Sequence, residues 1–409
     1  MPSTARSRRA FLAAAIAILS TLAAAGQTPR TPAPILVLVS FDGWRWDYFD
    51  RASTPNLHAL AARGVRAEGL IPSFPSKTFP NHYTIVTGLY PEHHGIISNN
   101  MWDDAIGQKF SMSADTAKDP RWWGGEPLWV TAIKQGRRAS SMFWPGAEVE
   151  IGGVRPTEAK PYSDDFPNAD RVQQVLAWLA LPEGRRPSFI TLYFSDVDTA
   201  GHDAGPNGAE TLAAASRLDG LLGMLVAGID RQGLTPRTSI VVVSDHGMSQ
   251  TAEDRKIYLD DYVDMAAVNV VDWSPVLHIA PKTGTADALY AKLRDKHPAL
   301  TVYRRAEIPA YLHFAGNPRI QPIIALAADG WAITTHTRDD SHPNGGEHGY
   351  DGRYMSMHGL FVAAGPDVRP GMVVPEFENI HIYELMCRML GLKPAKNDGD
   401  PAVTRGFLR

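Results

Sequence analysis

The chain has 409 residues, of which 44% are hydrophobic and 21% are charged, with a formal net charge of −4. This length and apolar content allow one large α/β domain with insertions. The slightly acidic balance excludes a broad basic surface for duplex nucleic acid, so the expected partners are small anions bound at a local site. A single cysteine, Cys387, excludes an internal disulfide.

The first 26 residues have the pattern of an export signal. Three arginines precede an apolar run from Phe11 to Leu22, and three alanines follow it as a small-residue cleavage site. The run is too short for a comfortable transmembrane span, so we expect no stable membrane insertion after its removal. Residues 7–12 also resemble a twin-arginine signal, and both the Sec and the twin-arginine routes stay open. We therefore expect a signal peptide over 1–26, a Pro/Thr linker over 27–34, and a periplasmic or secreted bacterial protein.

The first predicted core elements surround a hydroxyl. Ile35–Ser40 is a continuous apolar run, typical of a strand buried on both faces, and it leads to Asp42. Pro80 predicts a helix from about Asn81, with Thr78 and Phe79 extended before it. Thr78 would then lie at the positive end of a helix, either as a simple cap or as a nucleophile toward an anionic group.

Periodicity is lost from Asn99 to about Tyr162, where five tryptophans lie among Gly, Pro and Asp. We expect this insertion to be an aromatic-rich excursion beside the site and not part of the core. Regular patterns then return as a helix over 168–181, a strand over 189–194, a helix over 210–229 and a strand over 239–244.

A second insertion is expected near 255–340, as short strands with one helix near 287–296 forming a small lobe. A core strand over 359–364 and a closing helix over 380–390 follow it. Strands that alternate with helices and end in acidic residues predict an α/β fold, with a largely parallel central sheet flanked by helices. We expect a single catalytic domain over 35–405.

Carboxylates and imidazoles follow three predicted strands: Asp42, then Asp198 with His202, then Asp245 with His246. Open α/β sheets place their ligands at the carboxyl ends of their strands. Asp and His suit divalent cations, and two clusters suit a pair of ions. Asp198 and His202 are expected in a glycine-bearing loop. Taken singly, these residues also fit a turn or a local hydrogen bond, but together they favour a metal centre.

The motifs resemble those of the nucleotide pyrophosphatase/phosphodiesterase family, within the alkaline phosphatase superfamily. The matching stretches are Phe41–Gly43, Lys77–His82, Gly88–Gly95, Asp196–His202, Ser244–Met248, Asn317–Ile320 and His348–Asp351. They follow the family's order over nearly the whole mature chain, although Ser-Asp-His-Gly alone is shared across the superfamily. The resemblance implies an alkaline phosphatase-like core.

The resemblance also implies the site residues and two Zn²⁺ ions. One ion would be held by Asp42, Thr78, Asp245 and His246, and the other by Asp198, His202 and His348. His348 is preferred to His358 because the family's ligand lies in its His-Gly-Tyr-Asp loop. Asn99 would bind a phosphate oxygen together with the Thr78 N–H. Phe79 and Tyr193, with Tyr162 nearby, would flank a nucleobase.

The implied reaction is hydrolysis of a nucleotide phosphodiester or pyrophosphate bond. A divalent cation lowers the pKa of the Thr78 hydroxyl, which attacks phosphorus and forms a nucleotidyl-threonine. Water then hydrolyses this intermediate, and a nucleoside 5′-monophosphate leaves.

Four other functions are weighed against this one. A choline-phosphodiester or lysophospholipid hydrolase differs mainly in its pocket. A phosphomonoesterase would need a further cation for the extra substrate charge, and Lys77, beside Thr78, is expected to point away from it. A sulfatase is excluded because Cys387 has no Pro and Arg at the offsets that such an enzyme requires. A catalytically inactive metal-binding protein is disfavoured because all seven ligands and Asn99 are present.

Overall fold

The structure is a computed structural model that describes residues 32–338, 342 and 344–409. The predicted signal peptide, and all but the end of the predicted linker, lie outside these residues. Residues 34–409 form one compact unit.

A central sheet of eight strands, counted over the described residues, has the order β19-β2-β18-β9-β1-β8-β6-β7. Its strands are β1 (Ile35–Phe41), β2 (Gly64–Ala67), β6 (Ala139–Met142), β7 (Glu158–Lys160), β8 (Phe189–Phe194), β9 (Thr238–Val243), β18 (Phe361–Ala364) and β19 (Met372–Val374). β1 pairs in parallel with β8 and β9, whereas β18 runs antiparallel to β9 and β2. The predicted α/β fold with a largely parallel sheet is confirmed.

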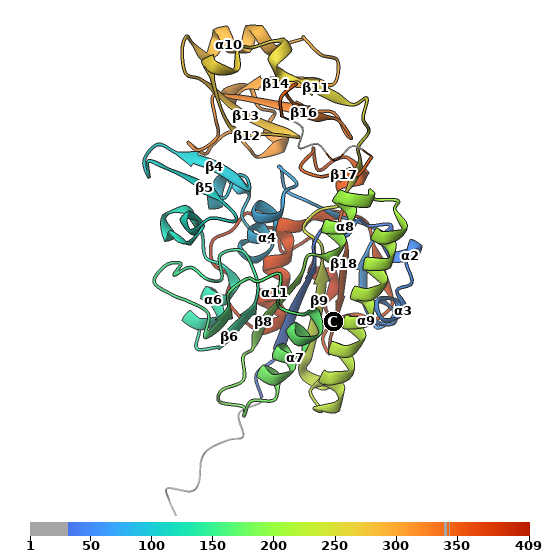
Figure 1. The fold of residues 1–409 in the computed structure, drawn as a ribbon. Coiled ribbons are helices and arrows are strands. Elements are labelled where there is room, and N and C mark those ends of the chain that lie inside the picture. Colours follow the sequence, from blue (N-terminus) through green and yellow to red (C-terminus); the bar gives the residue numbers. More distant parts are fainter. Residues whose placement is uncertain (1–31, 339–341, 343) are drawn as a thin grey trace, which may run out of the picture. The chain divides into compact units, whose positions relative to one another are not determined.

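Helices pack against both faces of this sheet (Figure 1). They are α2 (Tyr48–Arg51), α3 (Pro55–Ala62), α4 (Thr78–Thr87), α6 (Leu128–Lys134), α7 (Asn168–Leu179), α8 (Asp196–Ala204), α9 (Ala209–Arg231) and α11 (Ile382–Leu390), and the short helix α5 (Pro91–His94) contacts α4. Val37 and Val39 join the apolar cluster of α3, α7 and α9, whereas Leu36 and Leu38 join that of α4, α6 and α11. Both faces of β1 are therefore covered, which is why its sequence is continuously apolar.

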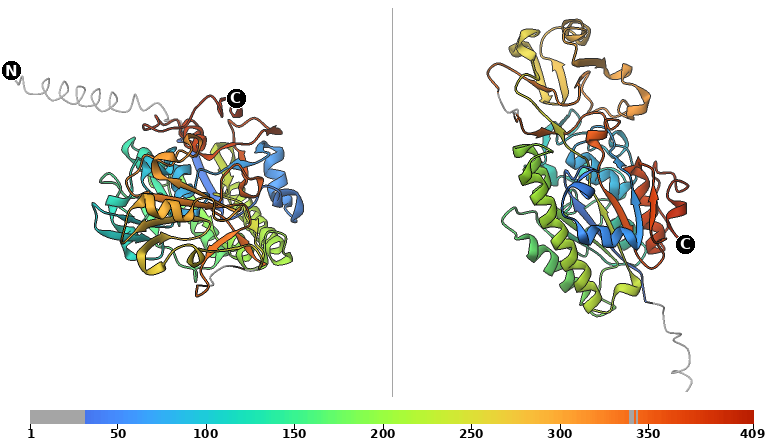
Figure 2. Two further views of the ribbon diagram at one scale, coloured as in Figure 1. Left: turned by 90° about the horizontal axis from the view of Figure 1, so that it is seen from above. Right: turned by 90° about the vertical axis from the view of Figure 1, so that its right-hand side faces the viewer.

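The longest helix, α9, is apolar and long enough by length and composition to cross a membrane, with a mean hydropathy of 1.5. In the fold its Leu218, Leu222 and Leu225 are buried in the apolar cluster that covers one face of the sheet. The right-hand view of Figure 2 shows the green helices α7 to α9 running side by side along that face. Packing in the core accounts for the apolar sequence of α9.

Residues 256–334 contain a separate four-stranded antiparallel sheet and are called the lobe below (Figure 1). Its sheet has the order β12 (Val268–Asp272), β13 (Val276–Pro281), β15 (Ile323–Ala327) and β14 (Leu300–Arg304), with α10 (Ala286–Leu293) packed against it. β11 (Lys256–Tyr258) and β16 (Ala332–Thr334) form a parallel pair. The remaining short strands are β3 (Leu70–Ile71), β4 (Asn100–Asp103), β5 (Gln108–Ser111), β10 (Ser249–Gln250), β17 (Gly346–Glu347) and β20 (Phe377–Glu378).

The segment 99–162 is more ordered and more buried than its sequence predicts. It contributes β6 and β7 to the central sheet, and four of its tryptophans lie in the core: Trp122, Trp123, Trp129 and Trp144. The expectation that this segment lies outside the core is therefore wrong. β6 has no apolar pattern because its buried Ser141 exchanges a hydrogen bond of 2.7 Å with Thr191 on β8, so a polar side chain is satisfied inside the sheet.

Candidate metal centre and nucleophile

Thr78 is the first residue of α4, and the extended residue Lys77 caps the helix. The prediction that Thr78 and Phe79 precede the helix is wrong, because the helix begins at Thr78 and Pro80 is its third residue. Proline is tolerated there because the first N–H groups of a helix have no partner within it. The Thr78 hydroxyl still lies at the positive end of the helix, 3.4 Å from His246 Nε2.

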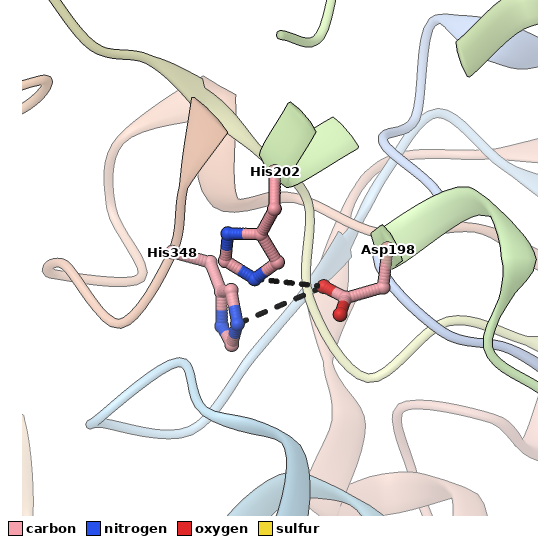
Figure 3. A group of neighbouring side chains, drawn as sticks. All are labelled: Asp198, His202 and His348. Atoms are coloured by element: carbon pink, nitrogen blue, oxygen red, sulfur yellow. Dashed lines mark ion pairs between the residues drawn. The ribbon is translucent and has the colours of Figure 1, made fainter. Parts of the chain in front are cut away.

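Asp198, His202 and His348 meet around one point, with the two imidazole rings turned toward the carboxylate (Figure 3). Asp198 Oδ1 lies 3.5 Å from His202 Nε2 and 3.7 Å from His348 Nε2. Asp198 and His202 lie on α8, so the predicted loop is wrong; four residues apart on a helix, they share one face. Gly201 lies within this helix and leaves room for Met248, whose Cε would lie 3.0 Å from a Cβ at that position.

Asp42, Asp245 and His246 form a second group beyond the ends of β1 and β9. His246 Nε2 lies 3.0 Å from Asp245 Oδ2 and 3.3 Å from Asp42 Oδ1. The turn at Gly43, with φ +66°, brings this group against Asp198 of the first one. Asp42, Asp198 and His246 each offer one possible metal-ligand atom, and these three atoms lie within 4.8 Å of one another, so the two groups adjoin.

Among the described residues, three buried carboxylate oxygens of this centre have no partner in hydrogen-bond geometry: Asp42 Oδ1, Asp198 Oδ1 and Asp245 Oδ2. Burial and the carboxylates of Asp245 and Asp198 raise the pKa of Asp42 well above its ordinary value. Burial lowers the pKa of His246, but the carboxylates of Asp245, Asp42 and Asp198 outweigh it and raise that pKa to about 9. Such concentrated negative charge, with imidazole nitrogens in reach, fits divalent cations such as Zn²⁺.

His82 is a buried member of the centre to which the sequence reasoning gave no role. Its Nδ1 donates to the Thr78 carbonyl at 2.9 Å and also lies 3.2 Å from Asp245 Oδ2. A carbonyl only accepts, so Nδ1 carries the proton, and in the neutral ring Nε2 accepts from Ser40 Oγ at 2.8 Å. The spacing of four residues from Thr78, once both are known to be helical, is the signal that could have identified it.

Asn99 lies beside the start of α4, as expected, where its Oδ1 accepts from the Phe79 N–H at 3.0 Å. Thr78 and Asn99 line a cleft of about 450 Å³ together with His202 and His348. The opposite wall of this cleft belongs to the lobe and includes Val270, Asp272, Trp273 and Ser274. The cleft therefore places the hydroxyl and the asparagine amide beside the candidate metal ligands.

The aromatic residues predicted to flank a nucleobase make contacts with other residues in the structure. Phe79 packs against Phe110, with ring centroids 5.9 Å apart. The Tyr193 hydroxyl donates to Asp42 Oδ2 at 2.6 Å, and the Tyr193 ring lies 5.9 Å from the half-exposed Tyr162. Within the described residues, the cleft lining includes none of Phe79, Tyr162 and Tyr193. Their contact with a nucleobase stays a prediction.

The histidines of the 342–358 region lie in different surroundings, and only some of them are near the candidate metal centre. His348 lies in the group with Asp198, whereas His358 packs against Gly69, where a Cβ would lie 3.0 Å from its Nδ1. His342, which has no motif support in the sequence, lies with its ring centroid 4.9 Å from that of His202. It also lines the cleft, so the structure adds it to the surroundings of the centre.

Comparisons with known proteins agree on one family. Residues 36–351 match the family described as type I phosphodiesterase / nucleotide pyrophosphatase. A venom phosphodiesterase of Macrovipera lebetinus is 39% identical over 385 residues, which cover 91% of this chain and 45% of that protein. Ectonucleotide pyrophosphatase/phosphodiesterase family member 3 of Rattus norvegicus is 36% identical over 404 residues, covering 94% of this chain and 46% of that protein. The chain thus spans about half the length of these curated relatives.

A solved structure is also similar over almost the whole fold. It is an inactive variant of murine ectonucleotide pyrophosphatase/phosphodiesterase 5 in complex with AMP, with a TM-score of 0.88 and 36% sequence identity. The similarity covers 92% of this chain and 100% of that chain.

Proposed function

The chain belongs to the type I phosphodiesterase/nucleotide pyrophosphatase family, and on this premise we propose that it hydrolyses nucleotide phosphodiester or pyrophosphate bonds and releases nucleoside 5′-monophosphates. In this proposal the protein is a secreted or periplasmic enzyme with two Zn²⁺ ions. Residues 35–405 act as one catalytic domain with insertions near 99–162 and 255–340, after a signal peptide and a linker. Its relatives include a venom phosphodiesterase and an ectonucleotide pyrophosphatase/phosphodiesterase, and these names support secretion.

One observation carries the proposal. The Thr78 hydroxyl lies at the N-terminus of α4, 3.4 Å from His246, in a centre where three buried carboxylate oxygens have no partner in hydrogen-bond geometry among the described residues. A nucleophile at the positive end of a helix, beside ligands for divalent cations, suits attack on an anionic phosphate. A purely structural Thr78 would not need such a costly arrangement of buried charge around it.

The proposed metal ligands are Asp42, Thr78, Asp245 and His246 for one ion and Asp198, His202 and His348 for the other. When bound, divalent cations lower the pKa of a hydroxyl and offset the charge on the phosphate oxygens. The Thr78 hydroxyl loses its proton to solvent, and Oγ attacks phosphorus in line with the bond to the leaving oxygen; the new P–O bond makes a nucleotidyl-threonine as the old one breaks and the leaving group departs. Water then attacks the same phosphorus, and the Oγ–P bond breaks. Thr78 regains a proton, and the hydroxyl from water leaves with the nucleoside 5′-monophosphate.

Asn99 holds the phosphate during both steps. Because its Oδ1 accepts from the Phe79 N–H, its amide NH₂ is the end left to donate to a phosphate oxygen. The first N–H groups of α4 favour the same charge. Hydrogen-bond donors fixed before the reaction stabilise the charge of the transition state without reorganising.

The nucleotide is the preferred substrate class in this proposal. The structural relative in complex with AMP supports it, and Phe79, Tyr193 and Tyr162 are proposed to contact the base. Base stacking on aromatic faces tolerates different bases, so we expect loose base selectivity. A choline phosphodiester or lysophospholipid differs mainly in the group that these residues would meet.

Substrate turnover tests the proposal. We expect chelator-sensitive hydrolysis of p-nitrophenyl thymidine 5′-monophosphate, with slower hydrolysis of p-nitrophenyl phosphate and of a choline phosphodiester. Thr78→Ala should lower kcat by at least about a thousandfold and abolish trapping of the covalent intermediate, because the attacking oxygen is gone. It should still bind most of the metal, since six proposed ligands stay. Thr78→Ser keeps a hydroxyl and serves as the control.

Two outcomes would contradict the proposal. Absence of chelator-sensitive turnover of all three esters would exclude the enzyme function. Normal kcat in Thr78→Ala would exclude Thr78 as the nucleophile.

A further inference from the structure

Lys77, the residue before Thr78, forms a buried ion pair with the lobe. Its Nζ donates to Oδ2 of Asp272, the last residue of β12, at 2.7 Å, and each side chain is only 8% exposed. The extended backbone at Lys77 was expected to turn this side chain away from Thr78, yet both residues line the same cleft. The Lys77 Cε lies 3.2 Å from where a Cβ would stand at Gly349, directly after His348. A cation therefore lies in the wall of the reaction cleft.

Asp272 also binds both neighbours of Asn99. Ser98 Oγ donates to Asp272 Oδ2, and Asn100 Nδ2 lies 3.4 Å from Asp272 Oδ1. The backbone N–H of Trp273 donates to the same Oδ1 at 3.1 Å. One carboxylate of the lobe thus fastens the segment before Thr78 to the segment that carries Asn99.

Asp272 is held as an anion by these contacts. Burial raises its pKa, but the charge of Lys77 and the hydrogen bonds from Lys77 and Ser98 outweigh burial, so the pKa lies below its ordinary value. His278 is opposite Asp272 in the sheet and is also buried, and burial lowers its pKa to about 4. His278 is therefore neutral near pH 7, and the charge that offsets Asp272 is that of Lys77.

This pairing matters because the candidate substrates differ in charge. A phosphodiester carries one negative charge, whereas a phosphomonoester near neutral pH carries nearly two. An ammonium group that is available in the cleft would favour the second, through a charge-assisted hydrogen bond to the additional anionic oxygen. An ammonium that is already paired with a carboxylate adds no net charge to the cleft. Its N–H that points to the carboxylate is also not available to a phosphate oxygen.

We propose that Asp272 sets the preference of this site for phosphodiesters over phosphomonoesters by withholding the Lys77 ammonium from the substrate phosphate. The inference rests on the proposed function and adds a specificity-determining residue to it. Asp272 acts through Lys77 and does not touch the reacting atoms, so it is a positioning residue.

The test is the ratio of two kcat/KM values, for p-nitrophenyl phosphate over p-nitrophenyl thymidine 5′-monophosphate. Asp272→Asn keeps the shape of the side chain but removes its charge, and should raise this ratio by about tenfold to a hundredfold, the range of a charge-assisted hydrogen bond. Adding Lys77→Met to that variant should return the ratio to about the wild-type value. Asp272→Glu, which retains the carboxylate, should keep the ratio low.

A merely structural role for Asp272 gives a different result. Both kcat/KM values would then fall by the same factor in Asp272→Asn, and an unchanged ratio would overturn the inference. If Asp272→Asn does not fold, Lys77→Met carries the test: its unpaired carboxylate should lower the ratio below wild type, and an unchanged or raised ratio overturns the inference. Wild-type protein that turns over neither ester would overturn the proposed function and this inference together.

Discussion

Gly43 joins the two groups of candidate metal ligands, and replacing it by alanine should push them apart. A Cβ at Gly43 would lie 2.7 Å from Asp198 Cα and 2.9 Å from Asp198 Cβ, so either the turn or α8 must move. The φ of +66° alone costs alanine about 1–2 kcal/mol, and overpacking adds about 1–3 kcal/mol. We expect Gly43→Ala to lower the free energy of unfolding by about 2–5 kcal/mol.

Gly107 supplies a matched control for the backbone term. It has a φ of +68°, nearly that of Gly43, but a Cβ there would meet nothing within 4 Å. Gly107→Ala should therefore lower the free energy of unfolding by only about 1–2 kcal/mol. The difference between the free energies of unfolding of the two variants therefore measures the effect of the contact between the turn after Asp42 and Asp198.

Urea unfolding followed by tryptophan fluorescence measures the stabilities, and metal analysis with turnover of p-nitrophenyl thymidine 5′-monophosphate measures the site. Gly43→Ala should be the less stable variant by about 1–3 kcal/mol and should lose bound metal and activity, since it displaces a proposed ligand. Gly107→Ala should keep both. Equal stabilities, with metal and activity intact in Gly43→Ala, would refute the argument that the two ligand groups are in steric contact through Gly43.

Two further predictions concern buried polar groups. His82→Leu should lower the free energy of unfolding by about 2–4 kcal/mol because it leaves Ser40 Oγ unpaired, and Ser40→Ala by about 1–3 kcal/mol. In urea unfolding, the double variant should cost about 1 kcal/mol less than the sum; strict additivity would argue against the hydrogen bond. Burial raises the pKa of the Cys387 thiol to about 12, so it should not react with dithionitrobenzoate near pH 8 until the protein is unfolded. Rapid labelling of the folded protein would contradict this.

The sequence predicts the sheet well where strands are continuously apolar. The strand over 189–194 has the predicted bounds, β1 is one residue longer at its end, and β9 begins and ends one residue earlier than predicted. β6 escapes prediction because its buried Ser141 is satisfied by Thr191 on another strand, which no local pattern reveals. The tryptophans of 99–162 are misjudged for a related reason, since their burial depends on α4 and α11 from distant parts of the chain.

The site also contains residues whose placement the sequence predicts and residues whose contacts it does not. Asp42, Asp198, Asp245 and His246 follow buried strands, so their convergence could be anticipated from sheet topology alone. Gly201 makes the sequence of α8 resemble a loop, although Asp196 and Asp198 favour the first turn of a helix. The contact of Asp272 with Lys77 spans 195 positions and joins the lobe to the core, so no spacing rule predicts it.

The same contact limits how this family member can change. The lobe resembles a self-contained unit, with its own sheet and its own apolar cluster. It nevertheless supplies the carboxylate that neutralises a lysine next to Thr78. A replacement lobe without a carboxylate at the position of Asp272 would leave the Lys77 ammonium buried without a counter-charge, which is strongly destabilising. The lobe is therefore not independent of the core, because a change at Asp272 requires a matching change at Lys77.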